Sequence, residues 1–213
     1  GYTAAIEAPL YSVFDETKVE QHLLQSTSPS SPLAPLATTT DAMATSSPTA
    51  GAPSAMTLAE KMAKYHLAPE LASPDAYLNT DGQPISLAQY RGKDVVLVDF
   101  WTYSCINCQR TLPYLTTWYS KYKDQGFVII GVHTPEFAFE HVESNVAAAL
   151  KQFGITYPVV LDNEYKTWNA YGNQFWPHEY LIDIDGFIVH DQIGEGDYDG
   201  TEKAIQAALM ERA

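Results

Sequence analysis

Apolar residues in this chain gather in short runs that mark the strands of a sheet. The run at 94–101 is continuous rather than alternating. Continuity of this kind is typical of a strand that is buried on both faces. A second buried strand is predicted at 127–132 and a third at 157–161. The pattern therefore predicts a central sheet with covered faces.

Helices are predicted between and around these strands. A helix is expected from Cys105 to about Lys123, with Pro113 inside it as the cause of a kink. Thr134-Pro135-Glu136 has the composition of a helix start, and apolar residues near helical spacing follow as far as residue 153. Shorter helical segments are expected at 58–67, 86–90 and 164–171, and a closing helix at 201–212.

Two Asp-Gly pairs predict hairpins. Asp185-Gly186 separates the apolar segments 179–184 and 187–190, and Asp81-Gly82 lies within 75–84. Strands and helices then alternate along the chain until the last hairpin and helix. Parallel crossovers followed by an antiparallel hairpin predict an α/β fold with a mixed central sheet.

Composition divides the chain into three parts. Residues 26–56 are mainly Ser, Thr, Pro and Ala, with one charged residue and no aromatic residue. Such a segment cannot bury enough apolar surface to offset its ordering entropy, so we interpret it as a linker. Residues 57–213 have the length of one α/β domain, and residues 1–25 form a separate N-terminal segment or tether.

The formal net charge of −14 argues against two classes of partner. Nucleic acids and anionic membrane surfaces both require a basic face. No apolar run approaches the ~20 residues that span a bilayer. Because the chain begins at Gly1 without a signal peptide, we expect a removed signal or a fragment of a longer protein. The Ser/Thr/Pro-rich linker favours an extracytoplasmic setting.

The only two cysteines lie in one window, Cys105-Ile106-Asn107-Cys108. They follow a buried strand at the point where a helix begins, and a helix N-terminus stabilises a thiolate through free N–H groups and partial positive charge. The thiolate is the reactive form. We predict a redox-active disulfide in which Cys105 is the exposed nucleophile and Cys108, one turn into the helix, resolves the mixed disulfide.

Other interpretations of the cysteines fit less well. A structural disulfide that closes so short a loop restricts the unfolded chain little. Zinc usually takes four ligands, and only His133 or His178 could join the pair. A peroxidase motif is incomplete, because Val98 stands where the peroxiredoxin pattern before Thr102 has proline. No metal, flavin or nucleotide cofactor is expected.

Two acidic residues are candidates for proton transfer. Asp99 lies inside the apolar strand, where desolvation should raise its pKa; the alternative is an edge-strand or capped aspartate. Glu136 is a second candidate, and its alternative role is that of an acid in the first turn of a helix.

Several motifs resemble the thioredoxin fold. The segment 98–101 followed by the dithiol and Pro113 resembles the active-site segment of thioredoxins, and residues 136–172 resemble the insertion of the TlpA-like branch. More narrowly, four segments resemble the thioredoxin domain of DipZ-type proteins of cytochrome c biogenesis: FWTYSCINCQRTLPY (100–114), GVHTPEFA (131–138), NQFWPHEYLIDI (173–184) and GEGDYD (194–199). The resemblance covers roughly residues 67–213. It implies a mixed central sheet flanked by helices, with the TlpA-like insertion and an N-terminal hairpin extension.

The resemblance also implies residue roles. Asp99 corresponds to the buried acid that relays a proton for Cys108, and Glu136 to an acid that TlpA-like proteins place near the cysteines. The Trp176–Pro177 bond is expected to be cis and to face the dithiol, so that Trp176 can pair with an extended substrate. Trp101 is expected beside the dithiol in the substrate site; its alternative role is plain core.

A thiol–disulfide oxidoreductase is the function that the resemblance implies. It would reduce disulfide-containing substrate proteins and receive electrons from a CcdA-like membrane carrier, to which such domains are typically fused. It would lie outside the cytoplasm, in the periplasm or cell envelope, tethered to the membrane. A disulfide oxidase or isomerase and a non-catalytic interaction module remain as alternatives, and the reduction potential separates them.

Overall fold

A mixed six-stranded sheet forms the centre of the computed structural model, which describes residues 56–212. The strand order is β1-β4-β3-β2-β5-β6. The β2–β3 and β3–β4 pairs are parallel, and the other three are antiparallel. The strands are β1 (Ala76–Leu78), β2 (Val95–Trp101), β3 (Phe127–His133), β4 (Val159–Leu161), β5 (His178–Ile182) and β6 (Ile188–Ile193). This arrangement confirms the predicted fold class.

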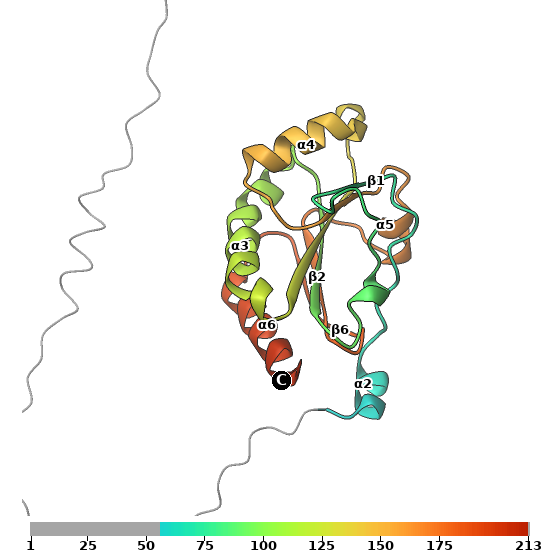
Figure 1. Cartoon of the computed structure of the whole chain (residues 1–213), viewed down its shortest axis with the longest axis vertical. Helices are drawn as coiled ribbons and strands as arrows, with labels where there is room; N and C mark the ends of the chain where they lie inside the picture. The colour runs from blue at the N-terminus through green and yellow to red at the C-terminus, as the bar shows by residue number, and fades with distance from the viewer. Residues whose placement is uncertain (1–55, 213) are drawn as a thin grey trace, which may run out of the picture. The chain divides into compact units, whose positions relative to one another are not determined.

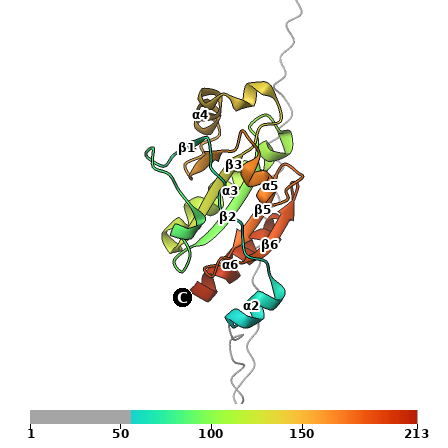
Figure 2. The same ribbon diagram turned by 90° about the vertical axis from the view of Figure 1, so that its right-hand side faces the viewer.

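Helices cover both faces of the sheet (Figures 1 and 2). Side chains of α3, α4 and α6 share one core cluster with Leu97 and Trp101, whereas α5 packs with Val98 and Phe100 on the opposite face. All seven residues of β2 are buried, as the continuous apolar run predicts. The helices are α2 (Leu58–Lys64), α3 (Ile106–Tyr122), α4 (Glu143–Gln152), α5 (Lys166–Ala170) and α6 (Tyr198–Arg212).

The predicted N-terminal hairpin does not form. After the turn around Asp81, where φ is positive, the chain makes no second strand, and β1 pairs antiparallel with β4 instead. The Asn79 side chain donates hydrogen bonds to the carbonyls of Ile155 and Tyr157, just before β4. The backbone of β4 thus forms the strand pairing with β1 that the second strand of a hairpin would have formed.

The predicted helix start at Thr134-Pro135-Glu136 is also wrong, because α4 begins only at Glu143. The backbone N–H groups of Glu136 and Phe137 donate to the carboxylate of Glu140, at 2.6 and 2.9 Å. These bonds fold the segment into a loop that ends in a short 3₁₀ turn, Ala138–His141.

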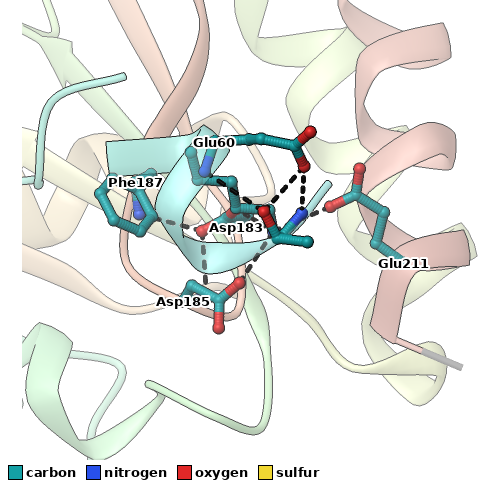
Figure 3. Close-up of polar contacts among 7 residues, drawn as sticks. Glu60, Asp183, Asp185, Phe187 and Glu211 are labelled. Atoms are coloured by element: carbon teal, nitrogen blue, oxygen red, sulfur yellow. Dashed lines mark hydrogen bonds and ion pairs between the residues drawn. The ribbon is translucent and has the colours of Figure 1, made fainter. Parts of the chain in front are cut away.

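The first helix is attached to the body of the domain by a buried lysine. Lys61 is 4% exposed, and its Nζ lies 2.7 Å from Asp183, 2.8 Å from Asp185 and 3.0 Å from Glu211 (Figure 3). Asp183 and Asp185 follow β5, and Glu211 lies in α6. The lysine therefore joins three elements at the end of the sheet where β2 begins.

Part of the predicted domain organisation lies outside the described residues. The N-terminal segment 1–25 and all of the linker except Met56 fall there. Among residues 56–212, no helix combines the length and the apolar character needed to cross a bilayer.

Candidate active site

The dithiol lies where β2 gives way to α3. β2 ends at Trp101, and Cys105 is the N-cap residue of α3, with its sulfur accepting a hydrogen bond from the backbone N–H of Cys108 at 3.5 Å. Cys105 is half-buried, whereas Cys108 is 1% exposed. Both are free thiols, so the structure shows the reduced state.

The helix end gives the two thiols different acidities. A hydrogen bond from the Cys108 thiol, with those from the backbone N–H groups of Cys108 and Asn107, lowers the pKa of Cys105 to about 6 despite partial burial. Burial, the Cys105 sulfur and the charge of Asp99 raise the pKa of Cys108 far above its usual range. Cys105 is therefore ionised at neutral pH, while Cys108 keeps its proton until a base removes it.

Asp99 is a buried acid on the face of β2 that packs against α3. It is 1% exposed and lies between Leu97 and Trp101, which pack against α3 with Cys108. Neither carboxyl oxygen has a hydrogen-bond partner among residues 56–212. Burial, with a smaller effect from Cys105, raises the pKa of Asp99 to about 8. The carboxyl can therefore change its protonation state near neutral pH.

The segment around Trp176 faces the nucleophile. The Trp176–Pro177 peptide bond is cis, as predicted. The Cys105 thiol points toward the Trp176 carbonyl oxygen as a hydrogen-bond donor, with the sulfur 3.9 Å from the oxygen. The Trp176 indole donates to the carbonyl of Thr134 at 3.0 Å and packs on Trp168. The structure thus brings Trp176 and Pro177 to the dithiol.

Trp101 occupies a different environment from Trp176. It is 0% exposed and belongs to the core cluster that contains Cys108. Its indole packs edge-on against His133. This burial favours the plain-core interpretation over direct contact with a substrate.

The structure places Glu140, rather than the predicted Glu136, beside the residues that precede the nucleophile. Glu136 is exposed, and its negative charge slightly raises the pKa of Cys105. Glu140 is fully buried and accepts a hydrogen bond from the Ser104 hydroxyl at 2.5 Å, beside the nucleophile. Burial alone would raise the pKa of Glu140, but hydrogen bonds from Ser104, Thr102 and the loop backbone lower it.

Sequence reasoning missed Glu140 and Glu179. Glu140 carries no signal, since nothing in its neighbours distinguishes it from Glu136. Glu179 does carry one, because it is an acid inside an apolar strand, as Asp99 is. It is 2% exposed and lies directly opposite Asp99 in the β2–β5 ladder.

The two histidines that could have joined a zinc site are engaged elsewhere. His133 Nε2 lies 3.3 Å from the Thr102 hydroxyl, and His178 Nδ1 lies 2.6 Å from the Asn173 side-chain oxygen. Residues 56–212 contain no group of His, Cys, Asp and Glu side chains arranged to hold a metal ion. Burial lowers the pKa of His133 to about 4.

Comparison with known proteins identifies the family. The sequence matches the Redoxin family over residues 63–209. The chain belongs to the Redoxin family. This redoxin chain is 54% identical over 143 residues to Protein DipZ of Mycobacterium tuberculosis. The match covers 67% of the chain and 20% of DipZ. It therefore spans about a fifth of the length of the DipZ proteins that it matches.

Two further similarities point to the same chemistry. The redoxin chain is 36% identical over 117 residues to the thiol-disulfide oxidoreductase ResA of Geobacillus thermodenitrificans, covering 54% of the chain and 64% of ResA. The solved thioredoxin domain of a Bacteroides vulgatus thiol-disulfide oxidoreductase is 31% identical, with a TM-score of 0.54; the match covers 66% of this chain and 96% of that domain. The redoxin domain is a thiol–disulfide oxidoreductase with a CxxC dithiol.

Proposed function

We propose that this domain reduces disulfides in substrate proteins, with Cys105 as nucleophile and Cys108 as resolving thiol. The observation that carries the proposal is the contrast between the two sulfurs. Cys105 caps α3 with a pKa of about 6, and Cys108 is buried and protonated beside Asp99. One thiol is therefore ready to attack, and the other is held until a mixed disulfide has formed.

The reaction proceeds in two exchanges. The Cys105 thiolate attacks a substrate disulfide, and the displaced substrate sulfur leaves as a thiolate that takes a proton from water. Asp99 then accepts the proton of Cys108, whose thiolate attacks the Cys105 sulfur and releases the second substrate thiol. The substrate gains two electrons, and the domain retains the Cys105–Cys108 disulfide.

Substrate binding is proposed along the Trp176–Pro177 segment. The Trp176 carbonyl already lies beside the nucleophile, where the backbone of an extended peptide could pair with this segment. The exposed side chains of Ile106 and Phe175 provide apolar surface in the dithiol motif and next to Trp176. Glu136 contributes an adjacent negative charge that moderates the acidity of Cys105.

Electrons for this reaction are proposed to come from a CcdA-like membrane carrier outside residues 1–213. The support is the similarity to DipZ, of which this chain matches about a fifth. Residues 26–56 would then tether the domain, residues 57–213, to a membrane part through residues 1–25, on the extracytoplasmic side. Deletion of residues 26–55 should slow electron delivery without changing the domain's reduction potential; unchanged delivery would contradict the tether.

The decisive measurement is the equilibrium reduction potential of the Cys105/Cys108 couple, with thiols counted by mass. A value near or below about −250 mV supports a reductant, and a value near or above about −180 mV supports an oxidase or isomerase. Without a reversible two-electron couple, the interaction-module alternative replaces the proposal. A Cys108→Ser variant should accumulate the mixed disulfide, whereas Cys105→Ser should form none.

A further inference from the structure

Glu179 belongs to a row of side chains that crosses the sheet below the dithiol. It pairs directly with Asp99 of β2 on one side and with Gln192 of β6 on the other. Directly opposed residues share a face of the sheet, with Cβ atoms about 4.5–5.5 Å apart. Because β6 is an edge strand, the row leads from the central strand under Cys108 to the border of the sheet.

The two acids of this row are closed off from solvent and from counter-charges. Asp99 and Glu179 are both buried, whereas Gln192 is half-buried. Neither Asp99 oxygen, nor Oε2 of Glu179, has a hydrogen-bond partner in the described part of the chain. The ion pairs found among residues 56–212 do not include either acid. Two adjacent carboxylates in such a place cannot both be ionised at low cost.

Apart from the Cys105 thiolate, whose charge helps to raise the pKa of Asp99, the groups next to the pair are poorly ionised at neutral pH. Cys108 approaches from α3. Tyr157, whose buried hydroxyl has no hydrogen-bond partner within residues 56–212, lies in the segment before β4. The β3 position opposite Asp99 is Gly131, and a Cβ there would lie 2.9 Å from the Trp101 indole nitrogen and 3.4 Å from the Tyr157 ring. The glycine thus admits both rings beside Asp99.

Tyr103, Tyr119, Tyr122 and Tyr198 also belong to the core cluster that contains Cys108, and a further titratable group lies on the edge strand. His190 of β6 pairs with Leu181, two residues beyond Glu179, and its Nε2 lies 3.2 Å from the Thr201 hydroxyl of α6. Burial and the charge of Asp99 raise the pKa of Glu179 well above its usual range. Because the pKa of Asp99 is about 8, most molecules hold a proton on each acid at neutral pH. In the fraction with Asp99 ionised, the pair holds one proton, on Glu179, and can accept a second one.

We propose that Glu179 is a positioning residue that passes to solvent, at the β6 edge, the proton that Asp99 takes from Cys108. The inference rests on the proposed role of Asp99. Resolution starts from the state in which Asp99 is ionised and Glu179 holds the one proton of the pair. The Cys108 proton moves to Asp99, Glu179 releases its own proton at the Gln192 side, and the Asp99 proton moves to Glu179. The original state returns, and no electrons move in these steps.

The test follows the two thiols separately in the reduced 213-residue protein, by stopped-flow reaction with dithiobis(nitrobenzoate). Attack by Cys105 releases the first coloured thiolate, and resolution by Cys108 releases the second in a first-order phase. Asp99→Asn should slow the second phase about a hundredfold at neutral pH, and Glu179→Gln about tenfold. The first phase should remain as in the wild type. The pH profile of the second phase should lose one of two ionisations in Glu179→Gln.

A matched control lies on the same strand. Tyr180 follows Glu179 but faces the opposite core cluster, so Tyr180→Phe should change neither phase. A normal second phase in Glu179→Gln with a slow one in Asp99→Asn would overturn the inference and leave the role of Asp99 intact. A normal second phase in both variants would remove the proposed role of Asp99, and the inference with it. Equal slowing in Tyr180→Phe would show a general structural effect and overturn the inference.

A second measurement needs no Glu179 variant. Infrared absorption of protonated carboxyl groups, followed from pH about 5 to about 10, should disappear in two separate steps in the wild type. In Asp99→Asn, a single step at lower pH than the later wild-type step should remain, because the charge of Asp99 no longer opposes ionisation of Glu179. If the wild-type protein showed a single step, Asp99 and Glu179 would not titrate as a coupled pair, and the inference would be overturned.

Discussion

Two identical thiol groups three residues apart have opposite acidities in this domain. Their difference arises from depth at one helix end, since Cys105 receives the hydrogen bonds of the first turn and Cys108 lies inside the core. The N-terminal partial charge of the helix adds to the effect on the outer sulfur. Side-chain chemistry alone therefore does not separate nucleophile from resolving thiol; local backbone geometry does.

Alkylation should display this difference directly. Iodoacetamide should modify Cys105 with a half-maximal rate near pH 6, because its pKa is lowered to about 6, while Cys108 should remain unmodified in the folded protein. Mass spectrometry of peptides from samples alkylated across the pH range measures both rates. In denaturant the two cysteines should react alike, with a pKa near the ordinary value of about 8.5. Similar rates for both residues in the folded protein would refute the assignment.

Asp99 should make the folded protein less stable as pH rises. Its pKa is 3.8 in the unfolded reference and about 8 in the fold, so the unfolded state loses its proton first and the free energy of unfolding falls between these values. Asp99→Asn should remove the contribution of Asp99 to this slope and stabilise the protein by about 4 kcal/mol at pH 7. Urea titrations at several pH values measure the change. The exposed Asp81→Asn should leave the slope unaltered.

Among the elements, the loop between β3 and α4 supports the residues that precede the nucleophile. Glu140 ties the backbone of Glu136 and Phe137 to the hydroxyl of Ser104 through one buried carboxylate. The loop and the end of β2 therefore depend on the same side chain. Loss of that side chain would remove the shared acceptor of donors in both segments.

Glu140→Ala should therefore be costly where Glu136→Ala is not. Three donors lose their acceptor in the first variant, and we expect a loss of about 3 kcal/mol in the free energy of unfolding. The exposed Glu136 should cost less than about 0.5 kcal/mol, and its removal should lower the pKa of Cys105. Urea unfolding and the alkylation profile measure both effects. Comparable destabilisation by the two substitutions would contradict the proposed division between them.

These elements also show how far sequence reasoning reaches. The CxxC pair, the strand that precedes it and Asp99 were predictable, because their positions follow from local apolar patterning and helix-end chemistry. Glu140 was not, because its burial results from a loop that folds back onto its own carboxylate. The missing hairpin has a similar cause, since the pairing of β1 with β4 is a contact between residues far apart in the chain.

For the whole molecule, Lys61 is the connection on which the first helix depends. Lys61→Ala would leave the buried Asp183 carboxylate without its cation, at a cost of about 3–5 kcal/mol. We expect faster amide hydrogen exchange throughout α2 and an unchanged reduction potential. Lys64→Ala is the control, because the Lys64 ammonium lies over the Tyr65 ring and makes no ion pair within the described residues. Equal effects of both variants would show that the buried ion pairs contribute little.

The location of this lysine has a practical consequence for handling the protein. Lys61 and Glu211 place both ends of the described chain near the start of β2, and the dithiol follows the other end of this seven-residue strand (Figure 1). A surface linkage, an affinity tag or a fused reporter at either end would leave Cys105 facing outward. The domain can therefore be attached to an electrode through one of these ends, with the Cys105 sulfur exposed to the solution.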